Sequence, residues 1–233
     1  MRESGVIEDT MAEEARLTAY PSDETRQRIM AAALETLREE GIAGTSARSI
    51  ARNGDFSQAA IFYHFGSVEQ LLVEACTNAS NAQVDSYRPR AHAANDLSAL
   101  VEIGRTLHSD ERQAGSMTVL TQLMAGAAGS DELSRTVTEN FERWIALVEV
   151  ALNNALGDHP LGELLPRRQV AVGISAMFLG MELMDQGGLA DAEPDTIFDA
   201  LEVIAELIES LRSMPEFIVR RAATRRTEGP PRI

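Results

Sequence analysis

The apolar residues of this chain recur at helical spacing along most of its length, and no stretch alternates apolar and polar residues as a strand does. Ile29, Ala33 and Leu37, for example, follow one another at intervals of four residues. Glycine and proline interrupt the pattern at positions typical of helix ends. The sequence therefore predicts an all-α fold with about nine helices, over residues 22–41, 46–53, 58–64, 68–87, 96–108, 110–126, 131–156, 167–187 and 195–213.

Several helix ends are marked by residues that satisfy exposed backbone groups. Ser22, Ser57 and Ser67 each precede an apolar-periodic run, where a hydroxyl can accept a hydrogen bond from the first turn. Gly41 is expected to end the first helix, because glycine readily takes the left-handed conformation found there. Pro89 is expected to end the fourth helix, because proline lacks the N–H that a helix interior requires.

Composition and charge divide the chain into four parts. Residues 1–21 form a predicted flexible arm, 22–66 a small helical domain, 67–214 a larger helical domain and 215–233 a disordered arginine-rich tail. The net charge is −15, but residues 22–66 carry 5 arginines against 6 acids, whereas residues 67–214 carry 23 of the 36 acids. The small domain is therefore close to neutral, and the overall charge does not exclude a nucleic-acid partner.

The rest of the composition points to a cytoplasmic protein. Cys76 is the only cysteine, so no disulfide can form within the chain. No stretch reaches the roughly 18 apolar residues of a membrane span. The polar, acidic N-terminus lacks the apolar run of a signal peptide. We expect no contact with a membrane.

Two short predicted helices, over 46–53 and 58–64, are separated only by a tight polar turn at Asn53-Gly54-Asp55. Helices this short are unstable alone and must pack on their neighbours. We expect Ile50 and Ala51, and then Ile61, Phe62 and Phe65, to face inward. Two packed helices joined by so tight a turn predict a helix-turn-helix, whose second helix enters the major groove of double-stranded DNA.

Polar side chains on this segment are candidates for DNA contact. A hydroxyl or free N–H at a helix N-terminus suits phosphate, arginine suits guanine or phosphate, and glutamine suits adenine. The candidates are Thr45, Ser46, Arg48, Ser57, Gln58, Tyr63 and His64. The alternative is that the aromatic run at residues 62–65 only builds a core.

The same segment resembles the TetR family of bacterial transcriptional regulators. The resemblance is carried by Thr25-Arg26, Ile29, Ala32-Ala33, Gly41, Thr45-Ser46, Ile50-Ala51, Phe56-Ser57, Ile61-Phe62-Tyr63-His64-Phe65, Ser67, Glu69 and Leu71. It implies a DNA-binding domain of three helices and a larger domain that dimerises through its last two helices and holds a small-molecule pocket. It also implies DNA contacts at Thr45, Arg48, Ser57, Gln58, Tyr63 and His64.

Three positions depart from the family pattern. The family commonly has glycine where Asp55 stands, tyrosine where Phe62 stands and a basic residue where Val68 stands. These changes add a negative charge near phosphates and put two phosphate contacts in question, although Tyr63 can take over the contact of the family tyrosine. We expect modest DNA affinity with a steep salt dependence.

Apolar stripes in the larger domain are candidates for an effector pocket. Methionine and aromatic residues can repack around varied apolar or amphipathic ligands, although an ordinary core is the alternative. A cationic ligand would be favoured by several buried acids near Trp144. The candidate residues are His108, Met117, Leu120, Thr121, Met124, Phe141, Trp144, Ile145, Val148 and Met177.

The last two predicted helices carry candidate dimer contacts. The final helix has apolar residues at steps of four and three, and the helix before it is apolar on nearly all faces. The candidates are Gly173, Met177, Gly180, Met181, Ile197, Leu201, Ile204, Ile208 and Leu211. A homodimer with two-fold symmetry implies a pseudo-palindromic operator.

The sequence favours a dimeric, ligand-responsive repressor without a cofactor. One alternative is a helical adaptor that has lost DNA binding, and an activator is also open. Another is an all-α enzyme, but the histidines at 64, 92, 108 and 159 show no metal-ligand spacing and no glycine-rich phosphate loop is present.

Overall fold

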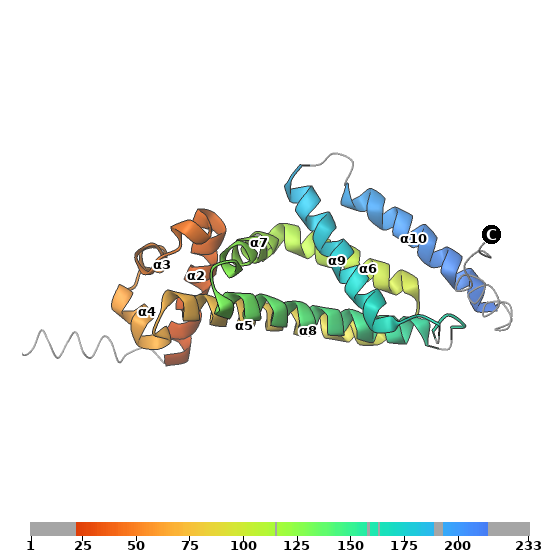
Figure 1. Ribbon diagram of the computed structural model, residues 1–233, viewed down its shortest axis with the longest axis horizontal. Helices are drawn as coiled ribbons and strands as arrows, with labels where there is room; N and C mark the ends of the chain where they lie inside the picture. The colour runs from red at the N-terminus through yellow and green to blue at the C-terminus, as the bar shows by residue number, and fades with distance from the viewer. Residues whose placement is uncertain (1–21, 115, 158, 163, 189–192, 214–233) are drawn as a thin grey trace, which may run out of the picture. The chain divides into compact units, whose positions relative to one another are not determined.

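The computed structural model describes residues 22–114, 116–157, 159–162, 164–188 and 193–213. The predicted arm at 1–21 and tail at 215–233 lie outside these residues. In the part of the chain that is described, nine α-helices and one short 3-10 helix are present and no strand, which confirms the all-α prediction. The elements, labelled in Figure 1, are α2 (Ser22–Gly44), α3 (Ala47–Gly54), α4 (Gln58–Phe65), α5 (Val68–Ala93), α6 (Leu97–Ala114), α7 (Ser116–Ala127), α8 (Asp131–Leu156), α9 (Arg167–Gln186), α10 (Pro194–Ser210) and η1 (Leu211–Ser213).

The chain forms two compact units. The first contains the chain up to Asn78 together with residues 121–134, and the second contains residues 79–120 and those from 135 onward. Helix α5 therefore contributes its first half to the first unit and its second half to the second. None of the described helices combines the length and hydropathy needed to cross a bilayer.

The first unit is built around α2. Its residues Ile29, Ala33 and Leu37 are fully buried, and Ile50 of α3 and Ile61 of α4 are buried with them. The three helices lie next to one another (Figure 1). Burying each such side chain contributes about 1.5–3 kcal/mol. This packing is what lets two eight-residue helices persist.

Gly41 interrupts α2 as predicted, but one more helical turn follows it. Its φ of 69° and ψ of 176° break the helix, and the helix resumes to Gly44. The break exposes the N–H of Ile42, which donates to Oε1 of Gln122 on α7 at 3.0 Å. A backbone donor that the helix no longer satisfies is thus paired within the same unit.

Cys76 lies in the core of the first unit, where only 4% of its surface is exposed. Burial raises the pKa of its thiol to about 12. Desolvation disfavours the charged thiolate, so this cysteine stays protonated and unreactive in the folded chain.

The second unit contains two apolar clusters. In one, Val84 and Tyr87 of α5 pack against Leu147 and Ala151 of α8, with Trp144 against the cluster. In the other, Leu97 of α6 and Ala205 of α10 pack with residues from the end of α8. Helix α10 packs chiefly on α6 (Figure 1).

The prediction that Pro89 ends the fourth helix is wrong, because α5 continues to Ala93. Proline inside a helix costs about 3 kcal/mol, since it removes one hydrogen bond and crowds the preceding turn. Ala91, one turn beyond Tyr87, is buried in the α5–α8 cluster. The burial of Ala91 helps to hold this last turn in the helix.

The predicted boundary between residues 108 and 110 is also wrong, because α6 runs through it to Ala114. Three side chains of this stretch contact neighbouring helices, and two of them, His108 and Glu111, are buried. His108 contacts Glu182 of α9 at 2.6 Å, while Asp110 and Glu111 accept hydrogen bonds from Tyr87 and Gln83 of α5. These contacts hold the stretch in one helix, although its residue types resemble a loop.

Candidate nucleic-acid interface

Helices α3 and α4 begin at serine caps; the sequence predicts the cap at Ser57, and the cap of α3 falls on Ser46 and not on Thr45. Ser46 accepts a hydrogen bond from the N–H of Ser49 at 3.2 Å, and the Ser49 hydroxyl accepts in return from the N–H of Ser46. Ser57 accepts from the N–H of Ala60 at 3.3 Å. Each cap pairs a backbone donor that a helix N-terminus leaves unsatisfied.

The turn between the two helices depends on Gly54 and Asp55. Asp55 has a φ of 53° and a ψ of 55°, the left-handed region, and its N–H donates to the carbonyl of Ala51. A Cβ on Gly54 would lie 1.9 Å from Cε1 of Phe56. Glycine is therefore required where the Phe56 ring folds back, while aspartate tolerates the left-handed position. This explains the order Gly54-Asp55.

Helix α4 buries one face and exposes the other. Ile61 and Phe65, one turn apart, are 0% and 6% exposed, whereas Tyr63 is 85% exposed. The expectation that Phe62 faces inward is wrong, because half of its surface is exposed. One residue advances the helix by about 100°, so Phe62 is turned from the buried face toward Tyr63. An exposed aromatic face is thus presented by a rigid helix.

Arg26 of α2 holds the C-terminal end of α4. Its guanidinium donates to the carbonyl of His64, forms an ion pair with Glu74 of α5 and lies 4.3 Å from the centre of the Phe65 ring. A cation near the last carbonyls of a helix also complements the helix dipole. Arg26 is a positioning residue that the sequence analysis did not select, although it belongs to the quoted family pattern.

Arg48 and Gln58 line a hollow surface between α3 and α4 together with Arg52, Asp55 and Ser57. Arg52 also pairs with Glu40 of α2. Thr45 is half-buried, and its hydroxyl donates to the carbonyl of Gly41 at 2.8 Å. Five of the seven predicted DNA-contact residues, Ser46, Arg48, Ser57, Gln58 and Tyr63, have exposed side chains. His64 is half-buried, and its ring meets that of Tyr63 edge-on at 5.0 Å.

The predicted effector residues divide between the two units. Thr121 and Met124 belong to the first unit, whereas the others lie in the second. There, His108 is buried against Glu182 and Trp144 lies 6.1 Å from the ring of Tyr87. Leu120, Phe141, Ile145 and Val148 are half-buried, Met177 is 43% exposed, and nothing is described of the Met117 side chain. Glu142 and Glu149, the acids closest to Trp144 in sequence, both pair with Arg168.

The predicted dimer residues differ in exposure. Gly173 and Met177 of α9 and Ile204 of α10 are exposed, whereas Met181 is buried. A Cβ placed on Gly173 or Gly180 would meet nothing within 4 Å. Ile197, Leu201, Ile208 and Leu211 are half-buried. The exposed stripe also includes residues that the sequence analysis left out, namely Val172, Met184, Val203 and Leu207.

Comparisons with known proteins agree with this geometry. Residues 29–75 match the family model of bacterial regulatory proteins, tetR family. The HTH-type transcriptional regulator SrpR of Pseudomonas putida is 25% identical over 150 residues, which cover 63% of this chain and 69% of that protein.

Solved structures share the fold. A protein of Pseudomonas aeruginosa PAO1 assigned to transcriptional regulation has a TM-score of 0.65 at 19% identity, covering 87% of this chain and 97% of that one. The multidrug-binding protein EbrR, in complex with imidazole, has a TM-score of 0.56 at 24% identity, covering 82% and 96%.

The matched segment spans the helices whose caps, turn and exposed face are described above. The helix-turn-helix of this chain is therefore that of the tetR family of bacterial regulatory proteins over residues 29–75, and the chain as a whole is similar to HTH-type transcriptional regulators.

Proposed function

We propose that the chain is a cytoplasmic, homodimeric repressor that binds a pseudo-palindromic operator and is released by a small apolar or amphipathic molecule. One observation carries the proposal: α4 is fixed by a buried face while its neighbouring residues Phe62 and Tyr63 are 50% and 85% exposed. An exposed aromatic patch on a fixed helix is the kind of surface that marks an interaction site.

The DNA contacts follow from this geometry. Gln58, at the start of α4, reads a base edge, and Tyr63 contacts phosphate or a neighbouring base. Arg48 contacts guanine or phosphate from α3. Thr45, Ser46 and Ser57 lie at helix N-termini, where N–H groups and the helix dipole favour phosphate. His64 contributes at the edge of this surface. Residues 22–66 form the DNA-binding domain.

Dimerisation is supported by an apolar face on the last two helices. Met184 is 51% exposed on α9, and Val203, Ile204 and Leu207 are 56%, 51% and 63% exposed on α10. Soluble monomers rarely expose a contiguous apolar face of this kind. The open surface at Gly173 and Gly180 lets another helix approach closely. A second copy of the chain would bury this face in a four-helix interface.

Effector control is supported by the family and by the shared helix α5. EbrR, which has the same fold, was solved with imidazole. In this chain, α5 supplies Leu71 and Leu72 to the core of the first unit and Val84 and Tyr87 to the second. A ligand that binds one position of α5 better than another shifts the DNA-binding equilibrium by that difference in affinity.

Genomic footprinting with the purified protein, followed by anisotropy titration on the recovered DNA, tests the proposal. Replacing Tyr63 or Gln58 with Ala is expected to weaken operator binding by about 1–3 kcal/mol each. Tyr63→Phe keeps the ring and loses only the hydroxyl, so it separates stacking from phosphate contact. Unchanged affinity in both alanine variants removes the contact assignment.

A helical adaptor without DNA binding is the second candidate, and Asp55 favours it. Its carboxylate lies on the hollow surface with Arg48 and Gln58, where phosphates would approach. Gel shifts on the footprinted DNA at low and at physiological salt separate the two candidates. Binding at low salt that weakens steeply with added salt identifies a DNA-binding regulator. Reporter expression then distinguishes repressor from activator.

A further inference from the structure

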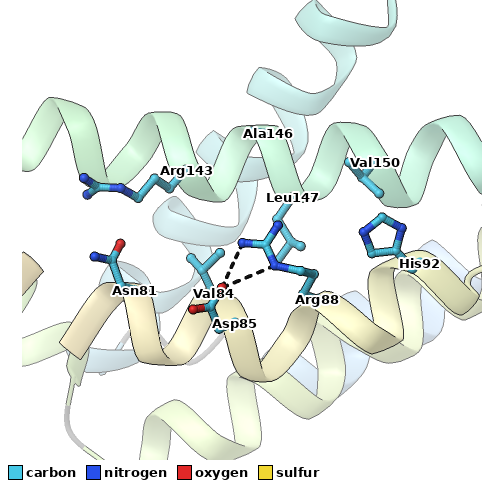
Figure 2. Close-up of a pocket in the computed structure, with 9 residues that line it drawn as sticks. All are labelled: Asn81, Val84, Asp85, Arg88, His92, Arg143, Ala146, Leu147 and Val150. Atoms are coloured by element: carbon cyan, nitrogen blue, oxygen red, sulfur yellow. Dashed lines mark hydrogen bonds and ion pairs between the residues drawn. The ribbon is translucent and has the colours of Figure 1, made fainter. Parts of the chain in front are cut away.

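A groove of about 430 Å³ lies between α5 and α8 in the second unit, and none of the predicted effector residues lines it. Figure 2 shows its lining: Asn81, Val84, Asp85, Arg88 and His92 on α5, and Arg143, Ala146, Leu147 and Val150 on α8. Its volume falls within the roughly 300–1,000 Å³ of small-molecule sites. The lining spans eleven steps of α5, which at about 1.5 Å per residue gives a length of roughly 16 Å.

The floor of the groove is apolar. Val84 and Leu147 face one another from the two helices (Figure 2), and they are only 5% and 6% exposed. Val150 and Ala146 extend this surface along α8. Because Val84 and Leu147 belong to a packed cluster, this part of the floor is preformed, and a hydrocarbon chain can lie along it and along Val150.

The rim is basic. Arg143 lies with Asn81 at one end of the groove, His92 lies at the other end, and Arg88 lies between them (Figure 2). Asp85 is the only acid in the lining. Two arginines and one acid give the lining a positive balance, in a chain whose net charge is −15.

The two arginines can offer hydrogen-bond donors to a ligand. Arg88 pairs with Asp85 at 2.8 Å, but these side chains are 55% and 68% exposed, and such surface pairs contribute about 0–1 kcal/mol. A bound anion can therefore replace Asp85. Arg143 donates to Asn140 at 2.8 Å and lies 3.8 Å from Glu139. A guanidinium has five N–H donors, so these contacts leave others available.

We propose that this groove binds an amphipathic anion, with a hydrocarbon body on Val84 and Leu147 and a carboxylate or similar acidic head on Arg88 or Arg143. Arginine binds carboxylates in a bidentate manner, which fixes the head. The apolar floor accommodates an unbranched chain or a single ring. Binding of the anion would displace α5 and so regulate DNA binding. This regulatory effect rests on the proposed function, whereas anion binding in the groove does not.

Trp144 provides a built-in reporter, because it is the only tryptophan of the chain and packs against the cluster that contains Val84 and Leu147. The full chain is titrated with decanoate, below its micelle concentration, and Trp144 fluorescence is recorded. Decanol and decyltrimethylammonium serve as uncharged and cationic probes of the same length. Decanoate is expected to bind at least tenfold more tightly than either, since charged hydrogen bonds contribute more than neutral ones.

Of the two variants Arg88→Gln and Arg143→Gln, the one that removes the arginine holding the acidic head is expected to weaken decanoate binding about tenfold. Arg168→Gln is the matched control, because Arg168 pairs with Glu142 and Glu149 of α8 and is not part of the lining. Circular dichroism verifies that all three variants are folded. Equal affinity for decanoate and decanol, or unchanged affinity in both groove variants, overturns the proposal.

A separate readout distinguishes this proposal from the proposed function. Operator binding is measured with and without saturating decanoate. Binding in the groove without operator release upholds the anion site and removes its regulatory role. If decanoate causes no change in Trp144 fluorescence while the protein still binds its operator, the anion site is overturned and the proposed function stands.

Discussion

Gly54 shows how a single residue sets the geometry of the turn between α3 and α4. Its Cα faces the ring of Phe56 so closely that a Cβ would lie 1.9 Å from that ring. No rotation of the glycine relieves such an overlap, so either the ring or the turn must move. The position of Gln58 at the start of α4 depends on this turn.

Gly54→Ala is therefore expected to lower the free energy of unfolding by about 1–3 kcal/mol, the usual cost of overpacking. Thermal unfolding followed by circular dichroism measures the loss. In the double variant with Phe56→Ala the overlap is gone, so the added cost of Gly54→Ala should fall below about 1 kcal/mol. An equal cost in both backgrounds would show that the ring is not the cause.

Asp55 places a negative charge in the hollow surface with Arg48 and Arg52. Asp55→Asn keeps a residue that tolerates the left-handed conformation and removes the charge. A charge–charge term at a solvated surface is about 1 kcal/mol, so DNA affinity should rise about fivefold. Anisotropy titration at two salt concentrations measures this. Glu193→Gln removes an exposed acid in the second unit and should leave affinity unchanged.

At the scale of elements, local chemistry predicts where helices begin more reliably than where they end. Ser46 and Ser57 cap α3 and α4 because the cap hydrogen bonds involve residues only three positions apart. Pro89 does not end α5, because the packing of Ala91 against α8 comes from a helix about 60 residues away in sequence. No local pattern contains that information.

Helix α10 caps the start of α6 through Glu209. The Glu209 carboxylate accepts from the N–H of Leu97 at 3.3 Å and from Nε of Arg212 at 2.7 Å. Arg212, and then the Leu97 N–H, lower the pKa of Glu209 below its ordinary value. Because the pKa of Glu209 is lower in the folded chain than in the unfolded chain, the ionised carboxylate stabilises the fold. This stabilisation is fully present above the pKa of the unfolded chain and is lost as the pH falls through the pKa of the folded chain.

Glu209→Gln should therefore lower the free energy of unfolding by about 1 kcal/mol at pH 7, and the difference from the natural chain should shrink and vanish as the pH falls through the lowered pKa of Glu209. Urea unfolding at several pH values measures it. Glu35→Gln is the control, because Glu35 pairs with Arg38 on an exposed face of α2 and should cost less than about 0.5 kcal/mol. A difference that persists at low pH would contradict the ionic cap.

At the scale of the whole molecule, an exposed apolar face on α9 and α10 predicts association. Leu207, 63% exposed, is the most exposed of the large apolar side chains on α10. Leu207→Glu should convert a dimer into a folded monomer and weaken operator binding more than a hundredfold, since each half-site then binds alone. Light scattering after size exclusion measures the mass. Leu207→Met keeps the apolar surface and should remain dimeric.

The all-α fold and the helix-turn-helix could be predicted from the sequence, because helical periodicity, helix caps and the family pattern within residues 25–71 are local features. The basic groove could not, because Arg88 and Arg143 lie on helices that only the tertiary fold pairs. Phe62 is expected to face inward, because an aromatic residue on a short helix usually does, but half of its surface is exposed. The buried contact between His108 and Glu182 likewise joins residues 74 positions apart.

Because Cys76 is buried and unreactive, the protein can be labelled at a single chosen position. The Cys76 side chain is shielded from maleimide reagents, so a cysteine introduced on an exposed surface becomes the sole target for a dye or a spin label. In the proposed dimer, labels attached beside each α4 would report the distance between the two copies of this helix in solution, and any change in that distance when the proposed effector is added.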